Sequence, residues 1–307
     1  MGRHQPVLPA EVLEALAIRK DGIYLDATFG RGGHSLAILG RLGRSGRLFA
    51  MDRDPDAVAF ARELANADPR FQIRQGPFSE IAGFMRDVGV SGRVDGILFD
   101  LGVSSPQLDD PSRGFSFSHD GPLDMRMDNR AGTTAAEWLA HADEKEIVAV
   151  LRHYGEEPHA RRIANAIIAY RADRALTRTS QLADIVTSVV RRRPGAHHPA
   201  TRTFQALRIF INRELEELRD ALAASLDILG AGGRLVVISF HSLEDRIAKR
   251  FMRDHARPDP VYAGLPDMPA SARPSLALVG KPRRADAVET ESNPRSRSAI
   301  LRVAERL

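Results

Sequence analysis

The chain has 307 residues, of which 43% are hydrophobic and 27% are charged, and its formal net charge is +4. This composition is typical of a folded globular protein and excludes a disordered or low-complexity chain. The absence of cysteine excludes disulfides and thiolate metal sites and agrees with a cytoplasmic location. We find neither an apolar run long enough for a membrane span nor a secretory signal near the N-terminus, so we expect no membrane contact.

The first hundred residues show strands and helices in alternation. The length exceeds that of one ordinary core, so two domains, or one domain with an insertion, are expected. Apolar strands are predicted over residues 23–27, 47–51, 71–75 and 96–100, and helices over 35–42, 55–67 and 79–88. Repeated strand–helix units of this length predict a parallel, right-handed wound α/β sheet.

A glycine-rich turn follows the first strand, and an acid ends the second. Residues 26–34 read D-A-T-F-G-R-G-G-H and contain Gly32, Gly33 and His34, and Asp52 comes at the tip of the next strand. In a wound α/β sheet such glycines let the backbone approach a nucleotide, and the acid accepts hydrogen bonds from a ribose. The pair predicts a cofactor that contains a nucleoside; a simple tight turn is the alternative.

The order of the glycines narrows the choice of cofactor. A dinucleotide site reads G-x-G-x-x-G and holds a pyrophosphate at a helix N-terminus. Here the order is G-x-G-G-H, with no third glycine in register. S-adenosylmethionine has a ribose but no phosphate, so the pattern favours S-adenosylmethionine over a nicotinamide dinucleotide.

The alternation stops after residue 104. Residues 105–200 contain no convincing strand, and helices are predicted over 134–141, 144–153, 159–172 and 180–192. We interpret this segment as a helical domain inserted into the core formed by residues 1–104 and 201–307. In the second part of the core we expect one long helix over 203–229 with Glu214 facing solvent, a strand over 234–240, a helix over 242–255, a long loop over 257–295 and a final strand over 298–304 that pairs inside the sheet.

Further candidate residues follow other strands of the predicted sheet. Asp100 ends the fourth strand, at the rim where such sheets bind ligands. Phe78 follows the third strand and could cover an adenine, although a core role is the alternative. His241 follows the fifth strand and is a candidate for RNA contact or proton transfer, whereas Ser242 with Asp245 has the form of a capping box.

Arginine clusters and aromatic residues raise the question of a nucleic acid partner. Arginines gather at residues 191–193, 283–284 and 295–297, and the pI is about 9.7. Such clusters suit a polyanion, but they also suit an ordinary solvated surface. Phe115, Phe117 and Trp138 in the insertion could stack on an unpaired base, although Trp138 is more typical of a helical core. No spacing typical of metal ligands is found.

Several motifs together resemble those of the bacterial 16S ribosomal RNA (cytosine-N4)-methyltransferases of the RsmH/MraW family. They cover nearly the whole chain in order, and only the Ala- and Arg-rich segment before Asn293 matches loosely. The matching segments are residues 4–8 (HQPVL), 26–35 (DATFGRGGHS), 52–55 (DRDP), 100–108 (DLGVSSPQL), 113–117 (RGFSF), 122–128 (PLDMRMD), 203–209 (TFQALRI), 239–246 (SFHSLEDR) and 293–299 (NPRSRSA).

The resemblance implies a class I S-adenosylmethionine-dependent methyltransferase core with an inserted helical substrate-recognition domain. It implies methylation of a cytidine at N4 in the decoding region of 16S ribosomal RNA, within the small ribosomal subunit, and leaves a homodimer open. Carried over by motif, the contacts to S-adenosylmethionine fall on a set of residues at the strand ends and one beyond them. These are Gly32, Gly33, His34, Asp52, Phe78, Asp100 and Gln107.

The expected reaction is displacement at the sulfonium methyl by the exocyclic amine of cytosine. Asp100 is the candidate catalytic residue, because an acceptor at the end of the fourth strand could hold the amine hydrogens. No general base can be assigned from the sequence. Two other classes stay open: a nicotinamide-dependent oxidoreductase, and a non-catalytic RNA-binding or assembly factor that keeps the cofactor fold.

Overall fold

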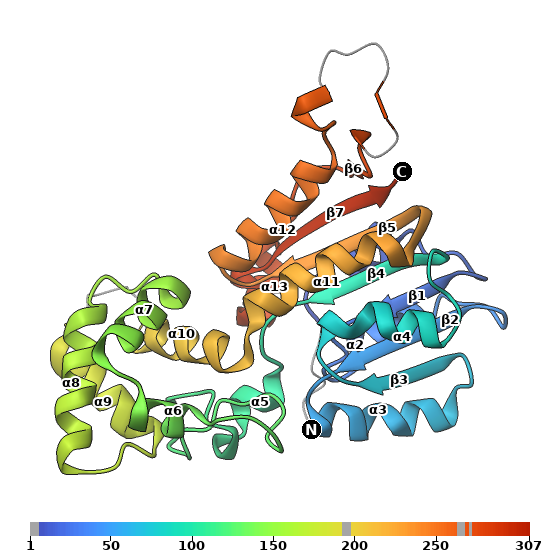
Figure 1. Cartoon of the computed structure of the whole chain (residues 1–307). Coiled ribbons are helices and arrows are strands. Elements are labelled where there is room, and N and C mark those ends of the chain that lie inside the picture. Colours follow the sequence, from blue (N-terminus) through green and yellow to red (C-terminus); the bar gives the residue numbers. More distant parts are fainter. Residues whose placement is uncertain (1–5, 192–197, 263–267, 270–271) are drawn as a thin grey trace. The chain divides into compact units, whose positions relative to one another are not determined.

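The structure is a computed structural model that describes residues 6–191, 198–262, 268–269 and 272–307. Two compact units make up the chain (Figure 1). The sheet unit comprises Met1–Gly102 and Leu215–Leu307, and the helical unit comprises Val103–Glu214. The helical unit is therefore longer at its C-terminal end than the insertion expected from the sequence.

The sheet unit contains seven strands in the order β3-β2-β1-β4-β5-β7-β6. Strands β1 to β5 are parallel, and β7 is antiparallel to its neighbours β5 and β6. This mostly parallel sheet is the class I Rossmann-like fold that was predicted, and the pairing of the last strand inside the sheet is confirmed. The strands are β1 Ile23–Asp26, β2 Arg47–Asp52, β3 Phe71–Gln75, β4 Val94–Asp100, β5 Leu229–Ser239, β6 Leu276–Leu278 and β7 Ile300–Arg306.

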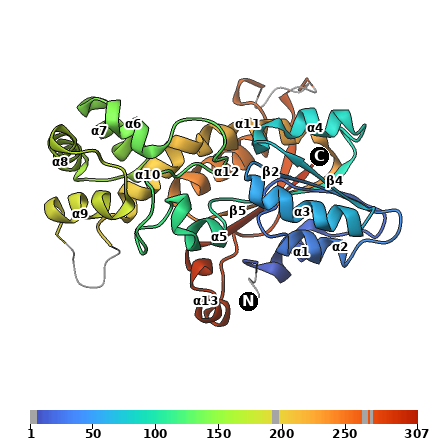
Figure 2. The same cartoon turned by 90° about the horizontal axis from the view of Figure 1, so that it is seen from below.

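Helices cover both faces of the sheet (Figure 1 and Figure 2). Side chains alternate along each strand, so Leu98 packs with α1, α2 and α3 on one face, whereas Ile97 and Phe99 pack with α4, α11 and α12 on the other. The short α13 follows β6 in the chain. These helices are α1 Pro9–Leu16, α2 Gly33–Leu39, α3 Pro55–Ala67, α4 Ile81–Asp87, α11 Glu214–Ile228, α12 Ser242–His255 and α13 Ala287–Ser292.

The helical unit has a hydrophobic core of its own. Capping boxes begin several of its helices, for example Thr134 with Glu137, and Asp143 with Glu146. The four helices predicted within the insertion are present. The helices of this unit are α5 Ser105–Asp109, α6 Ala135–His141, α7 Glu144–Gly155, α8 Ala160–Asp173, α9 Thr179–Val189 and α10 Thr201–Asn212.

The expected long helix over residues 203–229 is wrong. The chain forms α10 and α11 instead, and Arg213 separates them with a left-handed φ of 52°. The buried Asn212 side chain accepts a hydrogen bond from the Met127 N–H and donates one to the Met125 carbonyl, which ties the end of α10 to the helical core. Glu214 does not face solvent: it is buried and binds Arg208 through two hydrogen bonds.

Other differences concern short elements. Helix α1 was not predicted, and the expected loop over 257–295 contains β6 and α13. In the described part of the chain, no helix is long and apolar enough to cross a membrane.

Candidate functional site

The turn from β1 into α2 leaves room for little besides glycine. Gly32 has a φ of +73°, and a Cβ built on it would lie 2.7 Å from the ring of Phe29. A Cβ on Gly33 would lie 3.1 Å from the Pro6 ring. Because neither residue carries a side chain, the backbone of this turn is available for close contact with a ligand. The N-terminal segment at Pro6, which motif spacing alone did not connect to this turn, therefore packs directly against it.

Asp52 ends β2, and its carboxylate is hydrogen-bonded to the same turn. Its Oδ2 accepts a hydrogen bond from the Gly30 N–H at 2.7 Å, and its Oδ1 accepts one from the Asp54 N–H at 2.9 Å. Burial raises the pKa of Asp52 to about 6, and the two donors offset only part of this effect. A carboxylate oxygen can accept more than one hydrogen bond, so Asp52 can still receive hydroxyl donors from a ligand.

The ends of β1 and β4 are tied together by side chains. The Asp100 N–H donates to Oγ1 of Thr28 at 2.7 Å. Buried Asp26 accepts hydrogen bonds from the Ser35 hydroxyl and from the Thr28 N–H, and its burial raises the pKa of Asp26. The strand order reverses between β1 and β4, which is where open α/β sheets bind their ligands.

His34 and Asp100 meet at this point. Nε2 of buried His34 lies 3.5 Å from Oδ2 of Asp100. Burial lowers the pKa of His34, but the carboxylates of Asp100 and Asp26 outweigh it and leave the pKa above its ordinary value. Within the part of the chain that the structure describes, both ring nitrogens of His34 and Oδ1 of Asp100 are buried without a hydrogen-bond partner. Buried polar atoms in this state normally have partners, so they point to a ligand that supplies them.

Phe78 lies at the same rim, directly after β3. Its ring is partly buried and packs edge-on against Phe99, with the ring centroids 5.9 Å apart. One edge of the ring thus contacts the core while part of the ring stays exposed, and its contact with an adenine stays a prediction.

Gln107 belongs to the helical unit, apart from the residues above. Its Oε1 accepts a hydrogen bond from the Ser104 N–H at 2.9 Å, so it forms a capping box at the start of α5. Its contact with a cofactor stays a prediction that rests on the family motif.

The end of β5 differs from expectation in its cap. His241, not Ser242, is the N-cap of α12, and its partner is Glu244 rather than Asp245. Asp245 instead binds Arg302 of β7 through two hydrogen bonds of 2.7 and 3.0 Å. Nε2 of His241 lies 3.1 Å from buried Glu244 but makes no hydrogen bond among the described residues, so the structure shows the cap role, and RNA contact or proton transfer by His241 stays a prediction.

The three candidate stacking residues of the helical unit fall into two groups. Phe115 is buried in the helical core, and Trp138 packs against Phe210 with ring centroids 4.6 Å apart. Phe117 keeps partial exposure and stacks on His198 at 4.5 Å. Among the described residues, no three His, Asp or Glu side chains gather as metal ligands do.

The structure thus brings Gly32, Gly33, His34, Asp52 and Asp100 to one rim, with Phe78 directly after the neighbouring strand β3. One further contact there was not foreseen. The Leu8 N–H donates to Oε1 of Glu289 in α13 at 2.7 Å, which joins the N-terminal segment to the region before β7. Leu8 and Glu289 are 281 residues apart in the sequence, so no local pattern indicates this contact, although Leu8 belongs to the HQPVL motif.

Comparison with known proteins agrees with this geometry. The whole chain, residues 1–307, matches the MraW methylase family. The chain belongs to this family. The family's methylase chemistry matches a class I sheet with glycines after β1 and an acid at the end of β2, and the cofactor is S-adenosylmethionine.

Close relatives of this MraW-family methylase carry one name, "Ribosomal RNA small subunit methyltransferase H". The protein of Azoarcus sp. (strain BH72) is 57% identical over 308 residues, which are 99% of this chain and 97% of the relative. The protein of Shewanella amazonensis is 54% identical over 306 residues, with the same shares of both chains. The protein of Nitrosococcus oceani is 55% identical over 304 residues, which are 99% of this chain and 96% of the relative.

The residues at the rim fit S-adenosylmethionine. The Phe29 and Pro6 rings leave no room for side chains at Gly32 and Gly33, so the backbone of this turn stays open to a closely held ligand. Asp52 offers a carboxylate for ribose hydroxyls, and the unpartnered atoms of His34 and Asp100 need polar partners from outside the protein. None of these contacts requires a phosphate group on the ligand, and S-adenosylmethionine has none.

Proposed function

We propose that this MraW-family methylase transfers a methyl group from S-adenosylmethionine to the exocyclic N4 of a cytidine in the decoding region of 16S ribosomal RNA. The name that the relatives carry supports small-subunit ribosomal RNA as the substrate. The observation that carries the proposal is the unpartnered Oδ1 of Asp100 beside His34 at the end of β4. The choice of cytidine N4 rests on the family resemblance of the motifs.

The protein's own residues divide the work of holding the cofactor. Gly32, Gly33 and the His34 backbone would contact its amino acid part, and Asp52 would bind the ribose hydroxyls. Phe78 would cover the adenine, and Gln107 would add a contact from the helical unit. The cofactor supplies an electrophilic methyl group on a positively charged sulfur.

Asp100, which the family motif also assigns to cofactor binding, is in addition the group of the rim best placed to accept the hydrogens of the amine. The lone pair of the cytosine amine is delocalised into the ring, so the enzyme must orient the amine and accept its hydrogens. The Thr28 side chain fixes the backbone of Asp100, and Nε2 of His34 lies 3.5 Å from its Oδ2. A carboxylate held in this way can accept a hydrogen bond from the amine without moving during the reaction.

We propose the helical unit, Val103–Glu214, as the RNA-recognition domain. A cytidine in paired or stacked RNA must be splayed out, at a cost of a few kcal/mol. Phe117 and Trp138 both keep partial exposure, and Phe117 could stack on a base and offset part of that cost. We expect the reaction to take place in the cytoplasm, on the small ribosomal subunit.

The test is transfer of a tritiated methyl group to small ribosomal subunits, followed by nucleoside chromatography of the RNA. We expect the label in N4-methylcytidine, and in no other nucleoside. Label in another nucleoside would contradict the choice of target. Binding of S-adenosylmethionine without any transfer, to subunits or to protein-free 16S RNA, would instead favour the non-catalytic assembly factor.

A further inference from the structure

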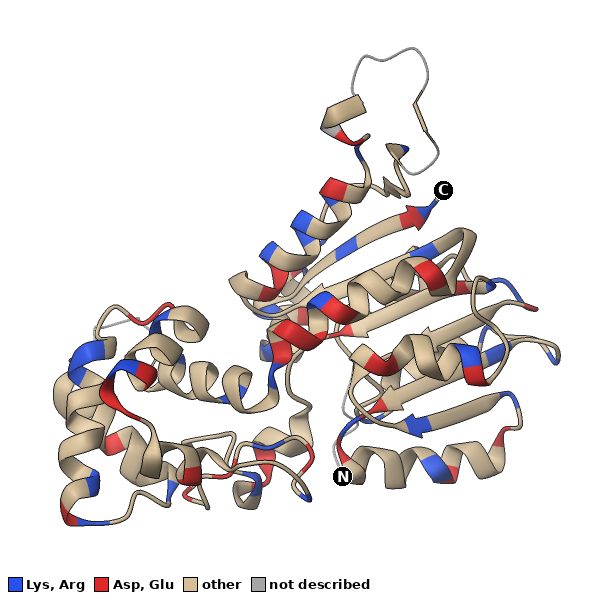
Figure 3. Ribbon diagram, viewed as in Figure 1, with Lys and Arg blue, Asp and Glu red and all other residues tan. Residues whose placement is uncertain are grey.

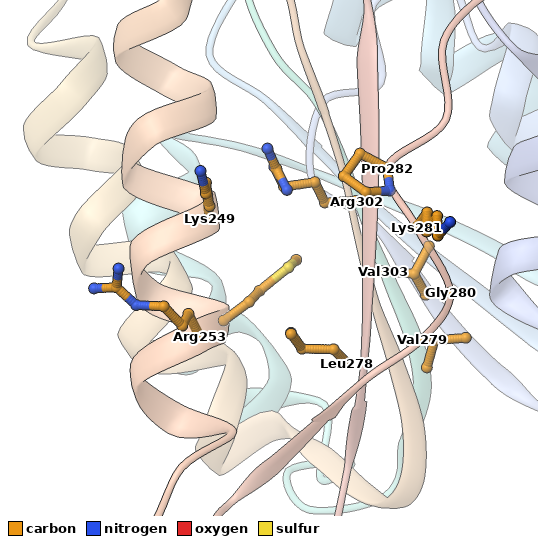
Figure 4. A pocket seen from close by; sticks show the side chains of 10 residues that line it. Lys249, Arg253, Leu278, Val279, Gly280, Lys281, Pro282, Arg302 and Val303 are labelled. Carbon is orange, nitrogen blue, oxygen red and sulfur yellow. The ribbon is translucent and has the colours of Figure 1, made fainter.

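A second recess lies in the sheet unit, away from the turn at Gly32. It has a volume of about 230 Å³ and opens between α12, β7 and the segment that follows β6. Figure 4 shows Lys249 and Arg253 on α12, with Leu278 and Lys281 across the recess. None of its lining residues takes part in the site described above.

The cations around this recess differ in whether a carboxylate neutralises them. Arg302 binds Asp245 through two hydrogen bonds, and Arg253 binds its neighbour Asp254. Lys249 and Lys281 are exposed, and neither has an acidic partner among the residues that the structure describes. Figure 3 shows further Lys and Arg residues along the helix α12 itself. The mouth of the recess is therefore positively charged, and Asp245 and Asp254 are already engaged by arginines.

The inside of the recess is apolar. Met252, Pro282 and Val303 line it, and Leu278 at its edge is 56% exposed. A large aliphatic side chain with this exposure, beside two unneutralised lysines, suits a ligand that has both an apolar face and a negative charge. A nucleotide has both, because its base has an apolar π-face and its phosphate is anionic.

We infer that this recess binds a nucleotide of the RNA substrate outside the methylated cytidine, with the base against Leu278 and the phosphates at Lys249 and Lys281. The inference rests on the proposed function, because it assumes that the polyanion is the RNA substrate. It adds a contact surface on the sheet unit to the RNA-recognition role proposed for the helical unit.

The position of the recess along α12 gives its distance from the rim of the parallel strands. Helix α12 begins at Ser242, next to the end of β5, and a helix rises about 1.5 Å per residue. Lys249 and Arg253 therefore lie roughly 10 to 16 Å along the helix from the rim of the parallel strands. This distance exceeds one nucleotide, so the bound nucleotide would be a different one from the target.

Two sets of variants separate the charge from the apolar surface. The double variant Lys249→Gln/Lys281→Gln removes both phosphate contacts, and Leu278→Ala removes the apolar contact. All three side chains are exposed, so we expect each variant to fold. Lys20→Gln is the control for each single variant, Lys249→Gln and Lys281→Gln, which are measured beside the double variant: it removes one positive charge from an exposed side chain of the sheet unit, just before β1 at the opposite end of the parallel strands from the rim.

The measurement is the affinity of fluorescently labelled protein for small ribosomal subunits between about 50 and about 200 mM KCl. We expect the double variant to bind about 10-fold more weakly near 0.1 M salt, with a salt slope smaller by about 1.4 to 1.8. Leu278→Ala should weaken binding about threefold with the slope unchanged. Lys20→Gln should match the wild type, and protein-free 16S RNA should compete for the same surface.

Two results would overturn the inference. One is a double variant that binds subunits with the affinity and slope of Lys20→Gln. The other is failure of protein-free 16S RNA to compete, which would mean that a protein occupies the recess. Methyl transfer by the wild type is measured in parallel. If the wild type transfers methyl groups and the recess variants leave the affinity for subunits unchanged, this inference alone is refuted. If the recess variants weaken RNA binding but the wild type transfers no methyl group, only the proposed function is refuted.

Discussion

Replacement of Asp52 by Asn tests the cofactor site most sharply within the protein. The carboxylate of Asp52 already accepts hydrogen bonds from the Gly30 and Asp54 N–H groups, and we expect it to accept ribose hydroxyls as well. An Asn side chain has one acceptor oxygen instead of two. One of the two N–H groups would then face an amide donor, and the ribose would lose a charged partner.

The magnitude follows from the kind of hydrogen bond that is lost. Hydrogen bonds to a charged group contribute about 1.5 to 3 kcal/mol, so affinity for S-adenosylmethionine should fall by about 10- to 150-fold. The pH dependence gives a second signature. The pKa of Asp52 is raised to about 6, so the carboxylate loses its charge as the pH falls through that value. Wild-type affinity should therefore be about 10-fold weaker near pH 5 than near pH 7.5, where the group is almost fully ionised.

Calorimetry with S-adenosylmethionine at both pH values measures these effects. Asp52→Asn should bind weakly and with little change in affinity between the two. Asp21→Asn is the control, because Asp21 is an exposed acid just before β1 in the same unit. An Asp52→Asn protein that is folded and keeps wild-type affinity and pH dependence would remove Asp52 from the site.

Three further substitutions test other parts of the rim. Asp100→Asn should raise the KM for S-adenosylmethionine about 10-fold and lower kcat by a smaller factor. A kcat that falls by about 100-fold with unchanged affinity for the cofactor would contradict this and assign Asp100 to proton transfer. Gly32→Ala should lower the free energy of unfolding in urea by about 1 to 3 kcal/mol more than Gly89→Ala does. Both glycines have a φ of +73°, but only Gly32 faces an aromatic ring, that of Phe29. Equal losses for the two variants would refute the clash. The raised pKa of His34 makes its stabilising contribution complete below its unfolded pKa of about 6.5, and the contribution is lost as the pH rises through the folded pKa. His34→Gln should therefore destabilise the protein more near pH 6 than near pH 9, and a pH-independent loss would mean that His34 is neutral throughout.

The parts of the site that depend on local sequence could be predicted. The turn after β1, the acid at the end of β2 and the acid at the end of β4 each belong to one strand and the residues after it. Parallel strands place such ends at one rim, so their meeting follows from the fold class. The contact between His34 and Asp100 could not be predicted in the same way, because it depends on the register that pairs Asp26 with Leu98.

Features that depend on packing between residues far apart in the sequence could not be predicted from local patterns. The apolar periodicity continues on both sides of Arg213, so it does not reveal the break between α10 and α11; the buried contacts of Asn212 do. Strand β6 has three residues and exists through its pairing with β7, which no local pattern indicates. Gln107 came from the family motif alone, and the structure shows it as part of a helix cap.

The central claim is tested most directly by nucleoside mass spectrometry of the decoding-region fragment, isolated from the small-subunit RNA of cells that lack this protein. The same cells are supplied with the wild-type chain or with Asp52→Asn. We predict that N4-methylcytidine at the decoding region is absent without the protein, returns with the wild type, and stays low with Asp52→Asn. N4-methylcytidine that persists at this position in cells without the protein would contradict the account.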